Sequence, residues 1–408
     1  MSNIKKNIAL LLLVQISNYV FPLVSLPYLM RTLGATEFGV IAISQAIIQY
    51  CIIFSDYGFN LSATRRLAIA DDKLTFNRVF LSTFFAKTLL VFFCGLVLLC
   101  IFPFIHGKQY NLIATAILFL SVIGNLLFPL YLFQAMESMA KIVWITIIAK
   151  FISLMSVFIL VKSKDDVIGA AISLSSGLII SGIISVIYIW KKQVITYTRI
   201  TIADIVESFT DGFPLFISNL AISFYTTFNV LFAGHHFTIE TVGNYSAAEK
   251  LRMAAQSLFT PVQQVIFPRV NKVYSRHGSL KSAVLKYGLI FITFGASITL
   301  FMLLFGEYLS ALYFGAKYSA APELFLKMAP LFVIISLSIV LGQWGLIVIG
   351  KAKTLSKIYI CGAIFHLVYL YPLVTYFSIS GLVYSVILTE LLICLMMACC
   401  LFFTLRTK

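Results

Sequence analysis

"IALLLLVQISNYVFPLVSLPYLM" (8–30) is an apolar run long enough to cross a lipid bilayer as a helix. Runs of about 20 apolar residues recur along the whole chain, which predicts helices because the strands of a membrane barrel are about half as long. Of the 408 residues, 61% are hydrophobic and 11% are charged, whereas an ordinary soluble domain carries roughly 25% charged residues. The first run is too long for the apolar core of a signal peptide. We therefore predict an all-α, polytopic membrane protein.

The apolar runs predict twelve transmembrane helices. They lie near 8–31, 38–59, 79–104, 112–133, 140–161, 167–190, 213–234, 242–267, 284–305, 325–349, 355–377 and 380–404. The longest break between them, "KKQVITYTRITIADIVESFTDG" (191–212), is also the most polar long stretch. We therefore expect an N-terminal six-helix bundle (1–190), a cytoplasmic linker (191–212) and a C-terminal six-helix bundle (213–408). A second polar stretch, 61–78, is expected to hold a short helix on the inner membrane surface.

The basic residues are distributed unevenly between the two sides of these spans. With the N-terminus inside, 20 of the 30 Lys and Arg residues fall on cytoplasmic segments, 6 on outer segments and 4 within spans. Cytoplasmic loops of membrane proteins carry such an excess, so we expect both termini in the cytoplasm. The same rule accounts for much of the net charge of +15, and no nucleic-acid partner is expected.

The two halves of the chain resemble each other weakly. "FGVIAISQ" (38–45) aligns with "VGNYSAAE" (242–249) at an offset of 204, and other short matches follow in order at offsets of 200–204. This pattern favours a duplication of six spans. Repeated halves in transporters place the substrate path at the repeat interface near the membrane midplane.

Polar side chains gather on one face of the span at 242–267. At 100° per residue an arc of about 80° contains Tyr245, Glu249, Arg252, Gln256, Thr260 and Gln263. The corresponding spans of the two halves carry polar faces with Asn18, Gln45, Asp56 and Asn219. We infer that these faces line a water-accessible cavity. The alternatives are that Glu249 and Arg252 form a purely structural pair and that the Asn and Ser side chains only join helices.

Three further charges lie within predicted spans, namely Lys87, Lys150 and Glu390. Together with Glu249, Lys250 and Arg252 they make four cations against two anions, an excess that suits an anionic or phosphate-bearing substrate. Lys87 could instead extend toward the cytoplasmic surface. Glu390 could be a protonated carboxyl held within the bundle or a site of proton coupling. Glu249, Glu390 and Asp56 are the candidates for ion coupling.

The sequence contains no motif for chemistry. It has no phosphate-binding glycine loop, no nucleophile elbow and no zinc-protease motif, so we expect neither an enzyme nor ATP hydrolysis, and no catalytic residue is assigned. The seven cysteines have no metal-ligand spacing, and the His236–Glu240 spacing fits a surface loop better than a metal site. No metal or other cofactor is expected.

Three stretches resemble the Wzx O-antigen flippases, the polysaccharide-transporter branch of the multidrug/oligosaccharidyl-lipid/polysaccharide exporter superfamily. They are "PYLMRTLGATEFG" (27–39), "DYGFNLSATRRLA" (56–68) and "GNYSAAEKLRMAAQSLFTPVQQVIFPR" (243–269). The resemblance covers essentially the whole chain. It implies two six-helix bundles around a central cavity in the bacterial inner membrane.

The resemblance also implies a substrate, an O-antigen repeat unit on undecaprenyl pyrophosphate that moves from the cytoplasmic to the periplasmic leaflet. An O-antigen polymerase is an implied partner. The charged cavity residues of the family map onto Lys87, Lys150, Glu249, Lys250, Arg252 and Glu390. The first span has no Asp or Glu, whereas multidrug antiporters of the superfamily often use a carboxylate there.

Two other functions compete with a flippase. An ion-coupled multidrug exporter of the same superfamily would have a cavity dominated by carboxylates and aromatic side chains, which the excess of cations disfavours. A membrane enzyme such as an O-antigen polymerase is expected to need a long periplasmic loop for its chemistry. The predicted outer loops are short, which disfavours this function.

Overall fold

The computed structural model describes residues 2–101, 111–277, 280–315 and 317–406, with the backbone alone at residues 2–20, 139, 275–277, 280–283, 405 and 406. Within these ranges the regular structure is helical throughout, which confirms the prediction of an all-α protein. Ten helical segments of the described chain are long and apolar enough to cross a membrane, by length and composition. The count of twelve spans stays a prediction.

The difference between ten and twelve arises at two places. The predicted spans 8–31 and 38–59 lie in one helix, α1 (Ser2–Asp56), which is interrupted only at Gly34 (φ 78, ψ 175). Glycine adopts this positive φ without the steric penalty that a Cβ would bring. The predicted span 242–267 is divided into α10 (Ile239–Gln256) and α11 (Phe259–His277), and neither is among the ten apolar segments.

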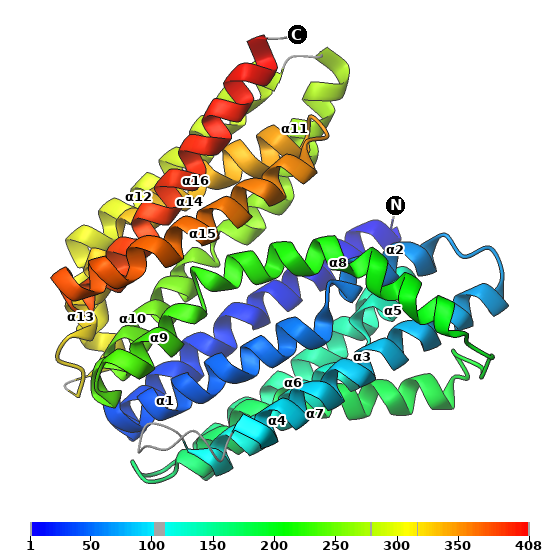
Figure 1. Ribbon diagram of the computed structural model, residues 1–408, viewed down its shortest axis with the longest axis horizontal. Coiled ribbons are helices and arrows are strands. Elements are labelled where there is room, and N and C mark those ends of the chain that lie inside the picture. Colours follow the sequence, from blue (N-terminus) through cyan, green and yellow to red (C-terminus); the bar gives the residue numbers. More distant parts are fainter. Residues whose placement is uncertain (1, 102–110, 278–279, 316, 407–408) are drawn as a thin grey trace. The chain divides into compact units, whose positions relative to one another are not determined.

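The chain divides into two units, Met1–Leu220 and Ala221–Lys408. The first unit contains α1, α2 (Phe59–Ala68), α3 (Lys73–Ile101), α4 (Leu112–Leu127), α5 (Leu130–Ala135), α6 (Met139–Leu160), α7 (Val167–Lys191) and most of α8 (Ile202–Phe224). Within it α7 packs along both α4 and α6 (Figure 1). The short helix expected within 61–78 is present as α2, and its buried face packs against α3 and α5.

Residues 202–220 of α8 belong to the first unit, although residues 202–212 were predicted as linker. Arg66 on α2 forms an ion pair with Glu207 on α8 (Nη2 to Oε2, 2.7 Å). One turn further, α8 passes so close to the corner between α1 and α2 that a Cβ at Gly212 would lie 2.5 Å from the carbonyl oxygen of Tyr57. The rings of Tyr57 and Phe216 stack with centroids 4.5 Å apart. Close packing therefore fixes α8 to this corner.

The second unit begins with the last residues of α8. It continues with α9 (Phe228–His236), α10, α11, α12 (Leu280–Phe314), α13 (Ala321–Lys327), α14 (Pro330–Ile339), a π-helix (Val340–Ile347), α15 (Ala352–Phe377) and α16 (Ser380–Arg406). Within this unit α15 packs along α16, and α12 packs against α14 (Figure 1).

Helix breaks interrupt several predicted spans of the second unit, and two of them have a local chemical cause. Between α8 and α9 the residues 225–227 form a turn, where the hydroxyl of Thr226 donates to the carbonyl oxygen of Ile222 (3.0 Å) and competes with the helix. Between α10 and α11 the break falls at Ser257. Pro261 has no N–H with which to continue the helix from Ser257, and it lies in the first turn of α11, where proline is tolerated.

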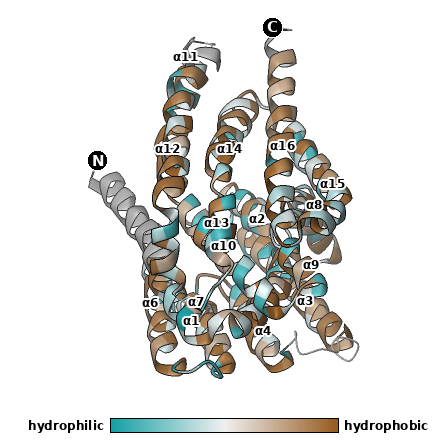
Figure 2. Ribbon diagram, turned by 90° about the vertical axis from the view of Figure 1, so that its left-hand side faces the viewer, coloured by the Kyte–Doolittle hydropathy of each residue, from teal (hydrophilic) through white to brown (hydrophobic). Residues whose placement is uncertain are grey.

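The apolar residues face outward as well as inward. Phe92 and Leu99 on α3 are 71% and 72% exposed, and Leu304 on α12 is 67% exposed. Figure 2 shows α12 and α16 hydrophobic over most of their length, whereas hydrophilic residues gather on α10. Outward-facing apolar side chains suit a lipid environment, because lipid tails are as apolar as the side chains themselves. The polar residues of the described spans are therefore exceptions that need a structural or functional reason.

Candidate functional site

The first unit contains a buried ion pair between two of its helices. Lys87 on α3 is 1% exposed, and its Nζ donates to Oδ1 of Asp56 at the end of α1 (2.7 Å). The same Nζ donates to the backbone oxygen of Asn125 on α4 (3.0 Å), and Nδ2 of Asn125 donates to Asp56 Oδ1 (2.9 Å). The three residues thus join α1, α3 and α4 through one carboxylate oxygen.

This pair corrects the charge count made from the sequence, which omitted Asp56. The predicted spans hold four cations, and with Asp56 they hold three carboxylates rather than two. The net charge within the spans is therefore one positive charge instead of two. The ammonium group of Lys87 is paired with Asp56, near the end of the predicted span 38–59. Buried charges are tolerated only when they are paired and hydrogen-bonded.

The second unit holds a bidentate ion pair on α10. Arg252, 5% exposed, donates from Nε to Glu249 Oε2 (2.8 Å) and from Nη2 to Glu249 Oε1 (2.6 Å), and its Nη1 donates to Oε1 of Gln256. The predicted pairing of Glu249 with Arg252 is therefore present. Glu390 on α16 is partly exposed and interacts electrostatically with Arg252. Of the predicted ion-coupling carboxylates, Glu249 thus contacts the guanidinium directly, whereas Glu390 lies within its electrostatic influence.

A second polar cluster in this unit was not predicted from the sequence. His366 on α15, Asn229 on α9 and Thr389 on α16 are each 0% exposed. His366 contacts Asn229 Oδ1 through Nε2 (2.9 Å) and Thr389 Oγ1 through Nδ1 (2.8 Å). The hydroxyl of Tyr369 also reaches Thr389 Oγ1, at 2.5 Å. We call these four residues the histidine cluster.

The histidine cluster lies beside the break between α8 and α9. Nδ2 of Asn229 donates to the backbone oxygen of Tyr225 (3.2 Å), a carbonyl that the interrupted helix leaves available. Broken helices within membranes are tolerated where side chains satisfy the freed backbone groups, and in transporters such breaks often form binding sites. The sequence signal was available, because His366 stands alone in a long apolar run and an ionisable residue there is a functional candidate by default.

The remaining predicted residues fall into both units. Lys150 on α6 and Gln45 on α1 are partly buried, and Asn219 on α8 is exposed. Lys250 on α10 is partly buried. Asn18 lies in α1, but its side chain is outside the described residues. The structure therefore brings together Asp56 with Lys87, and Glu249 with Arg252 and Gln256. The assignment of the predicted residues to a shared cavity stays a prediction.

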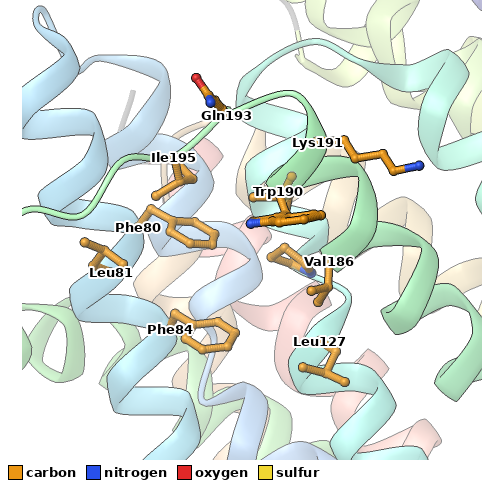
Figure 3. A pocket seen from close by; sticks show the side chains of 11 residues that line it. Phe80, Leu81, Phe84, Leu127, Val186, Trp190, Lys191, Gln193 and Ile195 are labelled. Atoms are coloured by element: carbon orange, nitrogen blue, oxygen red, sulfur yellow. The ribbon is translucent and has the colours of Figure 1, made fainter.

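The first unit also has an apolar pocket of about 580 Å³ (Figure 3). Its walls come from Phe80 and Phe84 on α3 and from Val186 and Trp190 on α7, with Lys191 among the lining residues. None of the predicted site residues lines it. The pocket has few polar groups for a sugar or a phosphate, so the two charged clusters are the better candidate sites.

Residues 4–274 match the model of a protein family described as "Polysaccharide biosynthesis protein". A protein of Shigella dysenteriae named "Putative O-antigen transporter" is 39% identical over 396 residues, which are 96% of this chain and 98% of that protein. A protein of the same name from Escherichia coli (strain K12) is 32% identical over 395 residues, which are 96% of this chain and 95% of that protein.

Two solved structures have the same fold. One is described as "Lipid II flippase MurJ, inward closed conformation"; its TM-score is 0.78 at 10% identity, and the match covers 98% of this chain and 87% of that chain. The other is described as an inward-facing multidrug resistance MATE family transporter of the MOP superfamily, with a TM-score of 0.71 at 14% identity and 92% of each chain covered. At these identities the likeness shows the fold alone.

Proposed function

The chain belongs to the polysaccharide biosynthesis protein family, and from this premise we propose that it is a transporter of lipid-linked polysaccharide rather than an enzyme. In the finer form of the proposal it flips undecaprenyl-pyrophosphate-linked O-antigen repeat units from the cytoplasmic to the periplasmic leaflet. The observation that carries this proposal is the similarity, over nearly the full length of both chains, to two proteins named as O-antigen transporters.

The charged clusters support the proposal through the chemistry of the headgroup. A pyrophosphate needs cations and hydrogen-bond donors inside the membrane, where a guanidinium binds phosphate oxygens bidentately. Arg252 holds the two oxygens of Glu249 in this geometry, and a phosphate would compete with that carboxylate for the same N–H groups. Lys150 and Lys250 would add positive charge, and polar groups such as Gln256, Gln45 and Asn219 would hydrogen-bond sugar hydroxyls.

The mechanism we propose is alternating access between two six-helix bundles, with both termini in the cytoplasm of a bacterial inner membrane. The likeness of the fold to a lipid flippase and to an inward-facing transporter supports a transport mechanism of this kind. An O-antigen polymerase is the partner that would use the translocated unit.

Reconstituted proteoliposomes test the substrate. A fluorescent undecaprenyl-pyrophosphate oligosaccharide is placed in one leaflet, and its appearance in the other is followed beside efflux of a cationic dye. We expect glycolipid movement without dye efflux, and loss of that movement in Arg252→Ala with retention in Lys353→Ala, an exposed lysine on α15. Dye efflux without glycolipid movement would refute the proposal in favour of a multidrug exporter.

A further inference from the structure

The histidine cluster is a second site in the C-terminal unit, and its hydrogen bonds determine where the protons lie. Asn229 Nδ2 donates to a backbone carbonyl oxygen, which accepts only, so the oxygen of the amide faces His366. Nε2 of His366 therefore carries a hydrogen and donates it to Asn229. The remaining freedom of the cluster is at Nδ1.

Nδ1 of His366 meets a hydroxyl with two possible acceptors. Thr389 Oγ1 lies 2.8 Å from Nδ1 and 2.7 Å from the backbone oxygen of Ser385, and it has one hydrogen to donate. When that hydrogen points to Nδ1, the imidazole is neutral. When it points to Ser385, Nδ1 must carry a hydrogen of its own, and the imidazole is positively charged.

Both arrangements leave the cluster fully hydrogen-bonded. Tyr369 donates its hydroxyl hydrogen to Thr389 Oγ1 in either case, since that oxygen can accept two bonds. The change from one arrangement to the other needs only a rotation about the Cβ–Oγ1 bond of Thr389 and one proton from water, which becomes bound to Nδ1. The cluster thus offers a hydrogen-bond partner to the ring in either charge state.

The ionisable groups around His366 come from four neighbouring segments. Tyr369 lies on its own helix, and Tyr225 lies at the break between α8 and α9 with its ring centroid 6.3 Å from the imidazole. Tyr245 on α10 is within hydrogen-bonding range of Asn229. Glu390 follows Thr389 on α16 and interacts with Arg252, so a charge on His366 changes the field at the proposed headgroup site.

We propose that His366 is the site at which this protein binds a proton, and that binding and release of this proton couple transport to a pH difference across the membrane. This inference rests on the proposed function. It selects the proton over a metal cation as the coupling ion, and it assigns the role to a residue outside the carboxylates Glu249, Glu390 and Asp56.

Proteoliposomes carrying the fluorescent undecaprenyl-pyrophosphate oligosaccharide and a pH difference test the coupling. For one proton per glycolipid, a difference of about one pH unit shifts the distribution between the leaflets about tenfold in the wild-type protein. His366→Gln keeps a donor and an acceptor but cannot be protonated, so we expect equal filling of both leaflets. Thr389→Val, which removes the rotating hydroxyl, should give the same result, and the exposed His235→Gln is the matched control.

The outcomes separate the two proposals. Wild-type protein that moves no glycolipid refutes the flippase function. Wild-type protein that moves it without a response to the pH difference, or a His366→Gln variant that responds like the wild type, refutes the proton site alone.

A second measurement needs no variant to fold. The chain has five histidines, so nitrogen NMR of protein labelled at histidine can follow the ring of His366. As the pH falls from about 8 to about 3, a range wide enough for a histidine that is 0% exposed, we expect the signal of Nδ1 to change from an unprotonated to a protonated nitrogen. A signal that stays constant over this range overturns the inference.

Discussion

Removal of the Asp56 carboxylate tests whether the ion pair of the first unit is needed for stability. In Asp56→Asn the ammonium group of Lys87 stays 1% exposed and keeps its bond to the backbone oxygen of Asn125, but it loses its counter-ion. An unpaired buried charge costs about 3–5 kcal/mol. A loss of about 3 kcal/mol is roughly a 150-fold change in the unfolding equilibrium constant.

The reverse change should cost less. In Lys87→Met the Asp56 side chain, 24% exposed, keeps the hydrogen bond from Asn125 and some contact with its surroundings, so we expect about 1–3 kcal/mol. The double variant has no buried charge and should be more stable than Asp56→Asn. The single changes are therefore predicted to be non-additive by about 2 kcal/mol or more, as expected for residues in direct contact.

Unfolding in mixed micelles, titrated with sodium dodecyl sulfate and followed by circular dichroism, measures these free energies. Lys73→Met, at the exposed start of the same helix α3, is the matched control and should leave the free energy of unfolding nearly unchanged. If the double variant loses the sum of the two single effects, the pair does not act as a unit and the reasoning is wrong.

Three more variants probe other contacts. Gly212→Leu places a side chain against the carbonyl of Tyr57, 2.5 Å from the position of its Cβ, and we expect little folded protein in size-exclusion chromatography. Asn244→Ala removes an oxygen that accepts two backbone N–H groups at the start of α13, which should lower the free energy of unfolding by about 1–3 kcal/mol in the same micelle titration. Arg252→Lys cannot bind a phosphate at two points as the guanidinium binds Glu249, and the loss of one charge-assisted bond to the headgroup, about 1.5–3 kcal/mol, should slow glycolipid translocation about 10–150-fold. A rate within twofold of the wild type would speak against a role for Arg252 in headgroup binding.

The helical fold could be read from the sequence because its signal is distributed over the whole chain. A long apolar run in lipid forms an α-helix, because each backbone N–H and C=O group must find its hydrogen-bond partner within the segment. The pairing of Glu249 with Arg252 could also be predicted from the sequence, because residues three apart on a helix are neighbours.

The contacts between helices could not be read in this way. Lys87 and Asp56 lie 31 positions apart and meet Asn125 on a third helix, so no spacing rule joins them. The histidine cluster needs residues from α9, α15 and α16, and a lone histidine in an apolar run gives no indication of its partners. A kink near Pro261 could be expected from the sequence, but a division into two helices at Ser257 could not, because a proline fits a kink and a helix start equally well.

Because α8 starts within the stretch that the sequence predicted as a linker, we expect that a cut ahead of this helix leaves the two fragments joined. A chain cleaved between residues 192 and 202 would leave the second fragment with a helix whose residues 202–220 pack in the first unit. That fragment would then donate a helix to its partner, with Glu207, Gly212 and Phe216 as the docking contacts. Two separately expressed fragments are therefore expected to reassemble, as complementing pieces of a single transporter.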